Sequence, residues 1–292
     1  MNAGRRILVA LDSSAGSRAA LRRAAELARR IDAELIGLFV EDENLLQLAA
    51  LPFARELSAS GGAGRALSSD AMERELSRQA LSLEAELEAI AVALELRWSF
   101  QTRRGRVARE ILAAFAGHDL LAVGRAGMQP GYRRLGSTAR RLLSGAGFPV
   151  MLIGPVPAPA ESVLAVFDRS PAAELVIRRA LELTPPDEPL QVLVWAACRA
   201  ELASLEARLA ELAGARALEI HELVGGDRRA MTESVMQIAP TLLVIGQSDR
   251  LDPAALEALA GRFDGAVLRI PVPGSVGTGG DRAIGARSRS DG

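Results

Sequence analysis

The feature of this sequence that most constrains its fold is an order of segments that occurs twice. Short apolar runs alternate with longer amphipathic stretches over residues 7–153 and again over residues 163–270. In each pass the first apolar run ends in an aspartate, Asp12 or Asp168. Strands that alternate with helices favour a parallel doubly wound sheet, and a repeated order of elements indicates duplication. We therefore predict an α/β protein of two tandem, doubly wound, parallel five-stranded domains.

The hydrophobic pattern places the individual elements. Continuous apolar runs predict strands covered on both faces, and apolar residues at helical spacing predict amphipathic helices. In the first copy the predicted strands are 7–11, 35–40, 94–101, 120–123 and 149–153, and the predicted helices are 18–30, 70–92, 107–116 and the segment from 139. In the second copy the strands are 163–168, 191–196, 217–224, 242–245 and 266–270, with helices at 171–183, 200–213, 228–238 and 253–260. We expect Ser17 to cap the first helix.

The two copies differ in length. The predicted domains are residues 1–154 and 161–273, joined by a Pro-rich linker, and we expect the Gly-, Ser- and Arg-rich tail 274–292 to be disordered. Asp12 and Gly124 are 112 positions apart, whereas Asp168 and Gly246 are 78 apart. The first copy therefore carries an insertion at about 42–75, with a helix-like part over 43–57. It begins at the carboxyl end of a strand, where this fold places ligands. We therefore expect it to act as a lid over the ligand, as a docking site for a partner, or as structural cover.

Composition argues against several classes of function. The formal net charge of -1 gives no reason to expect nucleic-acid binding. The single Cys198 excludes an internal disulfide framework and a cysteine metal cluster, and the distant His118 and His221 argue against a zinc site. No apolar run approaches the length of a membrane helix, and the first one is too short for a signal peptide. We expect a cytoplasmic protein without a membrane partner.

A glycine-rich segment follows the fourth predicted strand. Residues 124–127 read Gly-Arg-Ala-Gly, and residues 136–138 read Gly-Ser-Thr at the start of the next helix. A loop of this kind before a helix presents free backbone N–H groups and the positive end of the helix dipole to an anion. Arg125, Arg133 and Arg134 add positive charge, and the absence of lysine excludes a Walker-type loop. The segment is predicted to bind the phosphates of a nucleotide; the alternative is a tight turn without a ligand.

These residues resemble the universal stress protein family in its tandem form. The ATP-binding members carry the pattern G-x2-G-x9-G-[ST], which Gly124, Gly127, Gly136 and Ser137 match with eight residues in the second gap. The resemblance covers nearly the whole chain at the level of element order, and its specific motif occurs only in the first copy. It implies a Rossmann-like fold and a regulatory protein of the stress response that is not an enzyme.

The resemblance also implies a set of binding residues. Asp12 would contact the adenosine moiety, Val40 would lie beside the adenine through its backbone, and Gly127, Gly136 and Ser137 would hold the phosphates of ATP or ADP, with or without Mg²⁺. The full candidate set is Asp12, Ser13, Val40, Gly124, Gly127, Gly136, Ser137 and Thr138. Ser13 either faces phosphate or satisfies a turn. No catalytic constellation is legible from the spacing of the residues.

The second copy departs from this pattern. Residues 246–252 lack the second glycine and carry Asp249 and Asp252 where phosphates would lie. Two like charges near a triphosphate oppose binding, so we expect no nucleotide there and interpret Asp168 as a turn residue. The runner-up hypotheses are an interaction module that binds no nucleotide and an adenylating or ATP-hydrolysing enzyme.

Assembly can also be predicted. Each copy ends in an apolar strand, 150–153 or 266–270, which would leave an exposed sheet edge if unpaired. Related single-domain proteins dimerise through this strand, so the resemblance suggests that the two copies pair internally as a pseudo-dimer. Further homodimerisation and an unidentified protein partner remain open.

Overall fold

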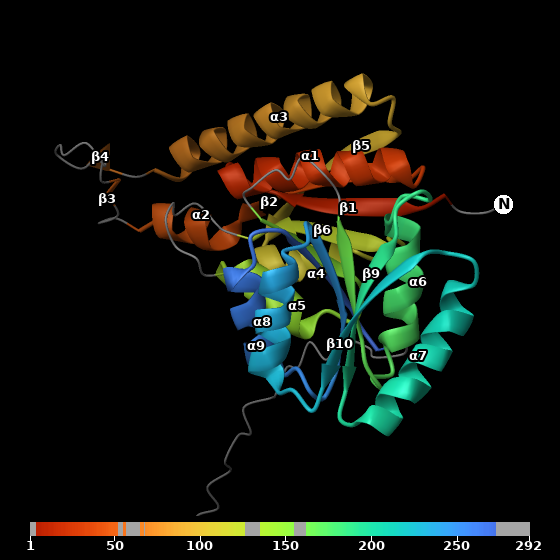
Figure 1. Ribbon diagram of the computed structural model, residues 1–292. Helices are drawn as coiled ribbons and strands as arrows, with labels where there is room; N and C mark the ends of the chain where they lie inside the picture. Colours follow the sequence, from red (N-terminus) through yellow and green to blue (C-terminus); the bar gives the residue numbers. More distant parts are fainter. Residues whose placement is uncertain are drawn as a thin grey trace, which may run out of the picture.

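The computed structural model describes residues 4–51, 55–56, 65–66, 68–125, 135–154 and 162–272. One ten-stranded sheet runs through the molecule in the order β10-β9-β8-β11-β12-β7-β6-β1-β2-β5 (Figure 1). The first half supplies β1 (Arg6–Leu11), β2 (Glu34–Asp42), β5 (Trp98–Gly105), β6 (Leu120–Gly124) and β7 (Val150–Ile153). The second half supplies β8 (Val163–Phe167), β9 (Leu190–Ala196), β10 (Leu218–Val224), β11 (Leu242–Gly246) and β12 (Ala266–Ile270).

The two halves have the same topology. In the part of the ten-stranded sheet that each half supplies, all neighbouring strands are parallel, and the half's first strand, β1 or β8, lies between its second and fourth strands of that sheet. The predicted α/β class with two tandem five-stranded units is therefore confirmed. Parallel strands need crossover connections, which are helices throughout the described parts of both halves.

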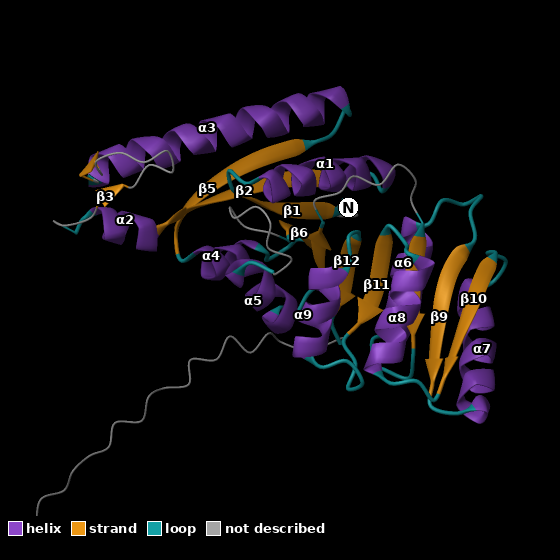
Figure 2. Ribbon diagram, turned by 60° about the vertical axis from the view of Figure 1, so that its left-hand side comes forward, coloured by secondary structure: helices purple, strands orange, loops and turns teal. Residues whose placement is uncertain are grey.

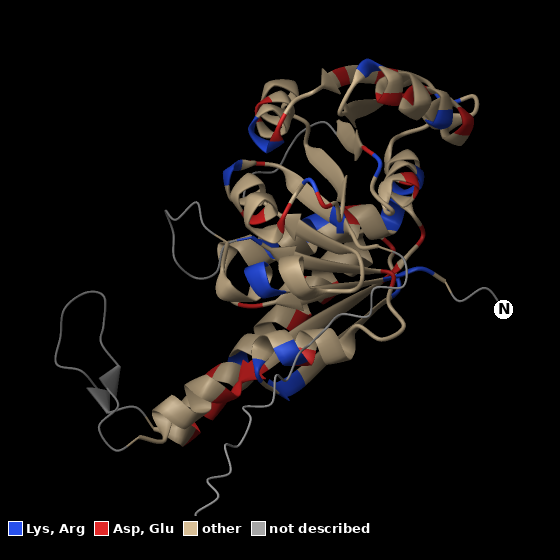
Figure 3. Cartoon of the chain, turned by 90° about the horizontal axis from the view of Figure 1, so that it is seen from below, with Lys and Arg blue, Asp and Glu red and all other residues tan. Residues whose placement is uncertain are grey.

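Helices cover both faces of the sheet (Figures 1 and 2). One face packs against α1 (Ala15–Arg30), α3 (Ser69–Ala93), α6 (Ala173–Leu183) and α7 (Arg199–Ala213), and the other packs against α4 (Val107–Ala114), α5 (Ser137–Gly145), α8 (Arg228–Ile238) and α9 (Pro253–Arg262). Alternate residues of each strand enter opposite cores, because successive side chains of a strand point to opposite faces. Ile7 and Val9 belong to the first core and Leu8 to the second. Most charged residues lie on helices and at strand ends (Figure 3).

The insertion contributes elements of its own. The helix α2 (Glu43–Ala49) follows β2, and β3 (Arg55–Glu56) pairs with β4 (Arg65–Ala66) as a separate two-stranded sheet. The second half lacks these elements, and its β9 leads almost directly into α7. In addition α3 has 25 residues, whereas the equivalent α7 has 15. The sequence predicts a helix-like piece over 43–57 that is interrupted by Pro52. Its first part is confirmed by α2, but its last part is wrong, because a strand lies at Arg55–Glu56.

The predicted strand at 94–101 is also displaced. The helix α3 continues to Ala93, and Glu95 then adopts a left-handed conformation with φ of 55°. The strand β5 begins only at Trp98 and continues through Arg103 and Arg104 to Gly105. Because β5 lies at the edge of the sheet, its charged side chains reach solvent.

The halves meet at one antiparallel strand pair. Val267 faces Leu152, Leu268 faces Met151 and Arg269 faces Val150, so β12 and β7 join the two halves into one sheet. This is the internal pairing that the apolar last strands predict, and it leaves neither of these strands as an edge. The sheet's remaining edges are β5 and β10.

A close backbone approach accompanies this pair. A Cβ atom added at Gly154 would lie 2.2 Å from the Asp264 carbonyl oxygen and 2.9 Å from that of Gly265. We predict that Gly154→Ala lowers the free energy of unfolding by about 1–3 kcal/mol, since backbone must move to admit the methyl group. The control is Gly145→Ala at the end of α5, where a Cβ would meet nothing within 4 Å. Chemical denaturation of both variants measures the difference, and equal stabilities would contradict the tight junction.

Candidate functional site

A pocket of about 270 Å³ lies at the carboxyl ends of β1, β2 and β6. It is lined by all the predicted site residues that the structure describes: Asp12, Ser13, Val40, Gly124, Gly136, Ser137 and Thr138. The eighth, Gly127, lies outside the described residues, as do Arg133 and Arg134. The structure thus brings together segments that are more than a hundred positions apart, because parallel strands end at the same edge of the sheet.

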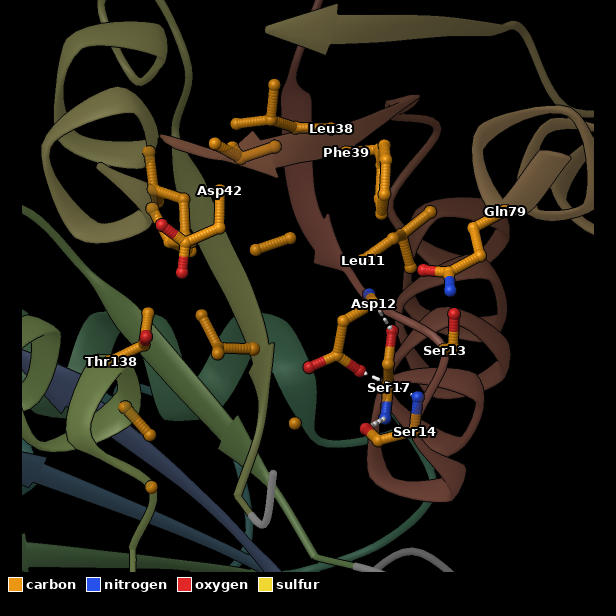
Figure 4. A pocket seen from close by; sticks show the side chains of 18 of the residues that line it. Leu11, Asp12, Ser13, Ser14, Ser17, Leu38, Phe39, Asp42, Gln79 and Thr138 are labelled. Carbon is orange, nitrogen blue, oxygen red and sulfur yellow. Dashed lines mark hydrogen bonds between the residues drawn. The ribbon is translucent and has the colours of Figure 1, made fainter. Parts of the chain in front are cut away.

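One wall of the pocket is the turn between β1 and α1. The Asp12 N–H donates to Ser17 Oγ at 2.8 Å, and the Ser14 N–H donates to Asp12 Oδ1 at 2.8 Å. Ser14 caps α1, because its Oγ accepts from the Ser17 N–H at 3.1 Å. The prediction of Ser17 as the N-cap is therefore wrong, because the N-cap is Ser14, at the start of the same turn. Asp12 Oδ2 accepts no hydrogen bond from the described part of the chain, and the carboxylate points into the cavity (Figure 4).

A second wall is the start of α5. Gly136 precedes the helix with φ of -59° and ψ of 157°, and its N–H donates to the Arg125 carbonyl at 3.2 Å. The Arg140 N–H donates back to the Gly136 carbonyl at 2.9 Å, which is the first bond of the helix. The N–H groups of the three residues between them have no acceptor within the helix. Since Ser137 and Thr138 line the pocket, this turn offers N–H donors and a positive dipole end to an anion.

Gly124 allows the backbone of α1 to pack closely on the end of β6. A Cβ atom at this position would lie 2.6 Å from the backbone carbon of Gly16 and 2.9 Å from the nitrogen of Ser17. Glycine is therefore required because the first turn of α1 packs directly on the end of β6. Gly124 also lines the pocket, so this packing requirement exists beside its predicted place in the binding site.

The third wall is apolar. Leu38, Val40, Val107 and Ile111 come from β2 and α4 and belong to one hydrophobic core. Leu45 of α2 adds to the lining. Together they form a surface on which a planar ring could pack.

Sequence reasoning missed most of the lining residues, and three of them lie in or directly after the insertion. Leu76 and Gln79 come from the start of α3, and Asp42 ends β2. Asp42 also caps α2, since its Oδ1 accepts from the Asn44 N–H at 2.9 Å. The available signal was the insertion itself, which begins at the ligand end of β2. Asp42 and Leu45 belong to the insertion. Leu76 and Gln79 follow it directly in α3.

Of the three arginines predicted to add positive charge, Arg133 and Arg134 lie outside the described residues, and Arg125 does not line the pocket. Among the described lining residues, Asp12 and Asp42 carry negative charge and none is cationic. Arg125 points instead toward the second half, where its Nη1 donates to the Ala260 carbonyl at 2.9 Å. Glu41 turns away from the cavity and accepts from Arg104 Nε at 2.8 Å, a bond that raises the pKa of Arg104. The anion-binding capacity of the described walls is thus that of helix N-termini.

The equivalent region of the second half is occupied by its own side chains. Asp168 is 5% exposed, and its two oxygens accept from the Ser170 N–H at 2.9 Å and from Ser248 Oγ at 2.6 Å. Arg250 lies 5.4 Å from the centre of the Trp195 ring and donates to the Trp195 carbonyl at 3.0 Å. The segment after β11 therefore lies over the carboxyl ends of β8 and β9, where the first half has its pocket.

The two carboxylates predicted to repel phosphate are Asp249 and Asp252, and the structure gives Asp252 a capping role in its own helix. Asp252 caps α9, and the N–H of Ala255 holds the pKa of Asp252 below its usual range, with help from Arg228. Asp249 lines a separate cavity between the halves together with the buried Arg269. Asp252 is thus a capping residue of the helix.

Comparison with known proteins finds one matching family model and several similar structures. Residues 4–154 match the model of the universal stress protein family. A universal stress protein from Archaeoglobus fulgidus has a similar structure, with a TM-score of 0.71 and 17% identity, over 91% of this chain and 98% of that one. A functionally unknown protein from Pseudomonas aeruginosa PAO1 superposes with a TM-score of 0.58 and 18% identity, over 92% of this chain and 93% of its own. At these identities the two structures show the fold alone.

A further comparison and two properties of the described residues bear on the kind of protein. No curated protein matches the sequence at a significant level. Within the described residues, no helix is long and apolar enough to cross a membrane, and no three His, Cys, Asp or Glu side chains are grouped to hold a metal ion.

The two halves allow a matched test of the glycine at the end of the fourth strand. Gly246 is the equivalent of Gly124, but a Cβ there would meet side-chain atoms, at 3.0 Å from Ala172 Cβ and 3.2 Å from Val176 Cγ2. Side chains can adjust more easily than backbone, so we predict that Gly124→Ala costs about 1–3 kcal/mol of stability and Gly246→Ala less. Thermal unfolding of both variants tests this, and an equal or larger loss in Gly246→Ala would refute the packing role of Gly124.

Proposed function

The chain belongs to the universal stress protein family, and on that premise we propose that its first half binds ATP or ADP. Nucleotide occupancy would be the signal that the protein carries in a stress response. The ligand would occupy the pocket at the ends of β1, β2 and β6. The second half would bind no nucleotide and would serve the structure.

The observation that carries the proposal is the convergence of three different walls on one cavity. The apolar wall with Val40 suits a purine base, the Asp12 carboxylate suits a donor such as a ribose hydroxyl, and the first turn of α5 suits phosphate. These are the parts of a nucleotide, and the parallel strand order supports the proposal because it brings the three walls to one edge of the sheet. A tight turn without a ligand, the alternative for the glycine segment, would not require the apolar wall.

Mg²⁺ would accompany the nucleotide without a dedicated protein site. Asp12 and Asp42 both face the cavity, but no described group of three or more acidic or His and Cys side chains is placed to hold the ion. Mg²⁺ usually keeps several waters and binds through one or two carboxylates plus substrate phosphates. The two carboxylates are compatible with that arrangement, and neutralising phosphate charge near them would favour binding.

The restriction to the first half rests on the filled second site. Binding there would have to break the bonds of Asp168 to Ser248 and displace Arg250 from Trp195. Trp195 occupies the strand position equivalent to Val40, since Leu11 pairs with Phe39 and Phe167 pairs with Val194. The large ring therefore stands where the first half leaves room for a base. We accordingly propose one nucleotide per chain.

The runner-up function is an interaction module that binds no nucleotide. It draws on the continuous sheet, in which the β7–β12 pair makes the chain resemble a dimer. Neither proposal assigns catalysis. A nucleotide-responsive protein would act in the cytoplasm, where ATP and ADP are abundant, and would pass its signal to a protein partner.

Calorimetric titration with ATP and ADP tests the proposal. We predict micromolar binding, which corresponds to about -8 kcal/mol, with one site per chain. Asp12→Ala should weaken it, and Gly136→Val or Gly127→Val should abolish it, because a branched side chain blocks approach to the backbone.

The matched control is Asp168→Ala in the second half. It should leave the dissociation constant unchanged but lower stability by about 1–3 kcal/mol, since the donors of Ser170 and Ser248 lose their buried acceptor. Absence of any heat with either nucleotide, together with an unshifted melting temperature, would favour the interaction module. A stoichiometry of two would overturn the restriction to the first half.

A further inference from the structure

We propose that Arg125 is a positioning residue through which the second half holds the start of α5 in place. The second half would thereby contribute to nucleotide binding although its own site is filled. This inference rests on the proposed function of the first-half pocket. It concerns a residue that contacts both halves of the chain and lies outside the pocket lining.

The side chain of Arg125 is anchored on the second half. It is 9% exposed, and its guanidinium donates to the carbonyls of Ala260, at 2.9 Å, and of Phe263. Its Nη2 lies 3.9 Å from Asp264 Oδ1. Ala260 and Phe263 belong to the end of α9, where carbonyls lack helical partners and the dipole is negative. A cation is favourable there, and a guanidinium can serve two carbonyls at once.

The backbone of Arg125 is anchored on the first half. Its N–H donates to the Ile153 carbonyl of β7 at 3.0 Å, and its carbonyl accepts from the Gly136 N–H at 3.2 Å. Gly136 immediately precedes α5 and lines the pocket. A shift of Arg125 would therefore move Gly136, and with it the N–H groups of Ser137 and Thr138.

The contact between the halves continues along the helices. The helix α5 packs against α9, and Arg140 Nε lies 3.1 Å from Glu257 Oε2. The first-half helix with the free N–H groups therefore rests on the second-half helix that Arg125 caps. Arg125 and α5 are supported by the same element.

The contact between the halves also involves a second buried arginine, which comes from the second half. Gln247 is equivalent to Arg125, since its N–H donates to the Ile270 carbonyl at 2.9 Å after the terminal glycine of β11. Arg269 of β12 caps α5 in its place by donating to the Ala146 carbonyl at 2.6 Å, and it also donates to Gln247 Oε1 at 2.9 Å. Arg269 is 5% exposed, so two buried arginines tie the halves together. Arg269 contacts the carboxyl end of α5, however, whereas only Arg125 is bonded to the residue before its first turn.

This asymmetry supplies a matched pair of variants. Arg125→Gln installs the side chain that the second half has at the equivalent position, and Arg269→Gln makes the same chemical change in the other arginine. Both variants lose a contact between the halves, so both should have a lower melting temperature. Three measurements on the full chain distinguish them: the dissociation constant for ADP, the melting temperature, and hydrogen exchange of the α5 amides from Arg140 onward without nucleotide.

We expect Arg125→Gln to raise the dissociation constant about tenfold, comparable to the loss of one charge-assisted hydrogen bond. It should also speed exchange at the start of α5. Arg269→Gln should leave the dissociation constant within about twofold of the wild type. Arg125→Lys keeps a cation that can reach one carbonyl, so its affinity should lie between those of the wild type and Arg125→Gln, and it replaces Arg125→Gln if that variant does not fold.

Equal dissociation constants for the two glutamine variants, or unchanged exchange at the start of α5 in Arg125→Gln, would overturn the inference. A wild-type chain that binds no ADP would instead refute the proposed function. In that case the exchange comparison still decides whether Arg125 positions α5, because it is made without nucleotide.

Discussion

The antiparallel pairing of β7 with β12 is the contact on which the rest of the structure depends. It turns two five-stranded sheets into one sheet of ten strands and pairs what would otherwise be two apolar edges. It also brings the last helices of the two halves together, so that α5 packs against α9. The arginines that cap these helices across the junction, Arg125 and Arg269, can reach their carbonyls only in this arrangement.

Within this symmetric frame the two halves have diverged in one place. Both have an aspartate at the end of the first strand and a glycine at the end of the fourth. In the first half the aspartate borders an open pocket, to which α2 of the insertion and the following helix α3 also contribute. In the second half the aspartate is bonded to Ser248, and Arg250 lies on Trp195. Polar groups of a buried site need partners, and side chains of the second half supply them.

Because of this difference the two halves can have different roles, and these roles depend on the contact between β7 and β12. The first half offers a place for a ligand, and the second half, with its own site filled, can act as a fixed support for α5. Arg125 links the two because its backbone contacts the pocket edge and its side chain contacts α9. A chain with two independent halves would have no need to bury a guanidinium at this point, since desolvating a charge is costly without several partners.

The order of strands and helices in the ten-stranded sheet, the duplication, and the place of the pocket with about a third of its lining residues could be read from the sequence alone. Apolar periodicity is a local property, and residues such as Asp12, Val40 and Gly136 lie at strand or helix ends that a parallel sheet gathers at one edge. Two wrong predictions concern helix ends, where neighbouring residues can take the same role. Ser14 caps α1 instead of Ser17, and α3 extends to the start of the strand expected at 94–101. Three features depend on the folded arrangement: α1 packs on Gly124, Asp42 and Gln79 line the pocket, and Arg125 points to the second half. These outcomes depend on contacts between residues far apart in the chain, which no local pattern encodes.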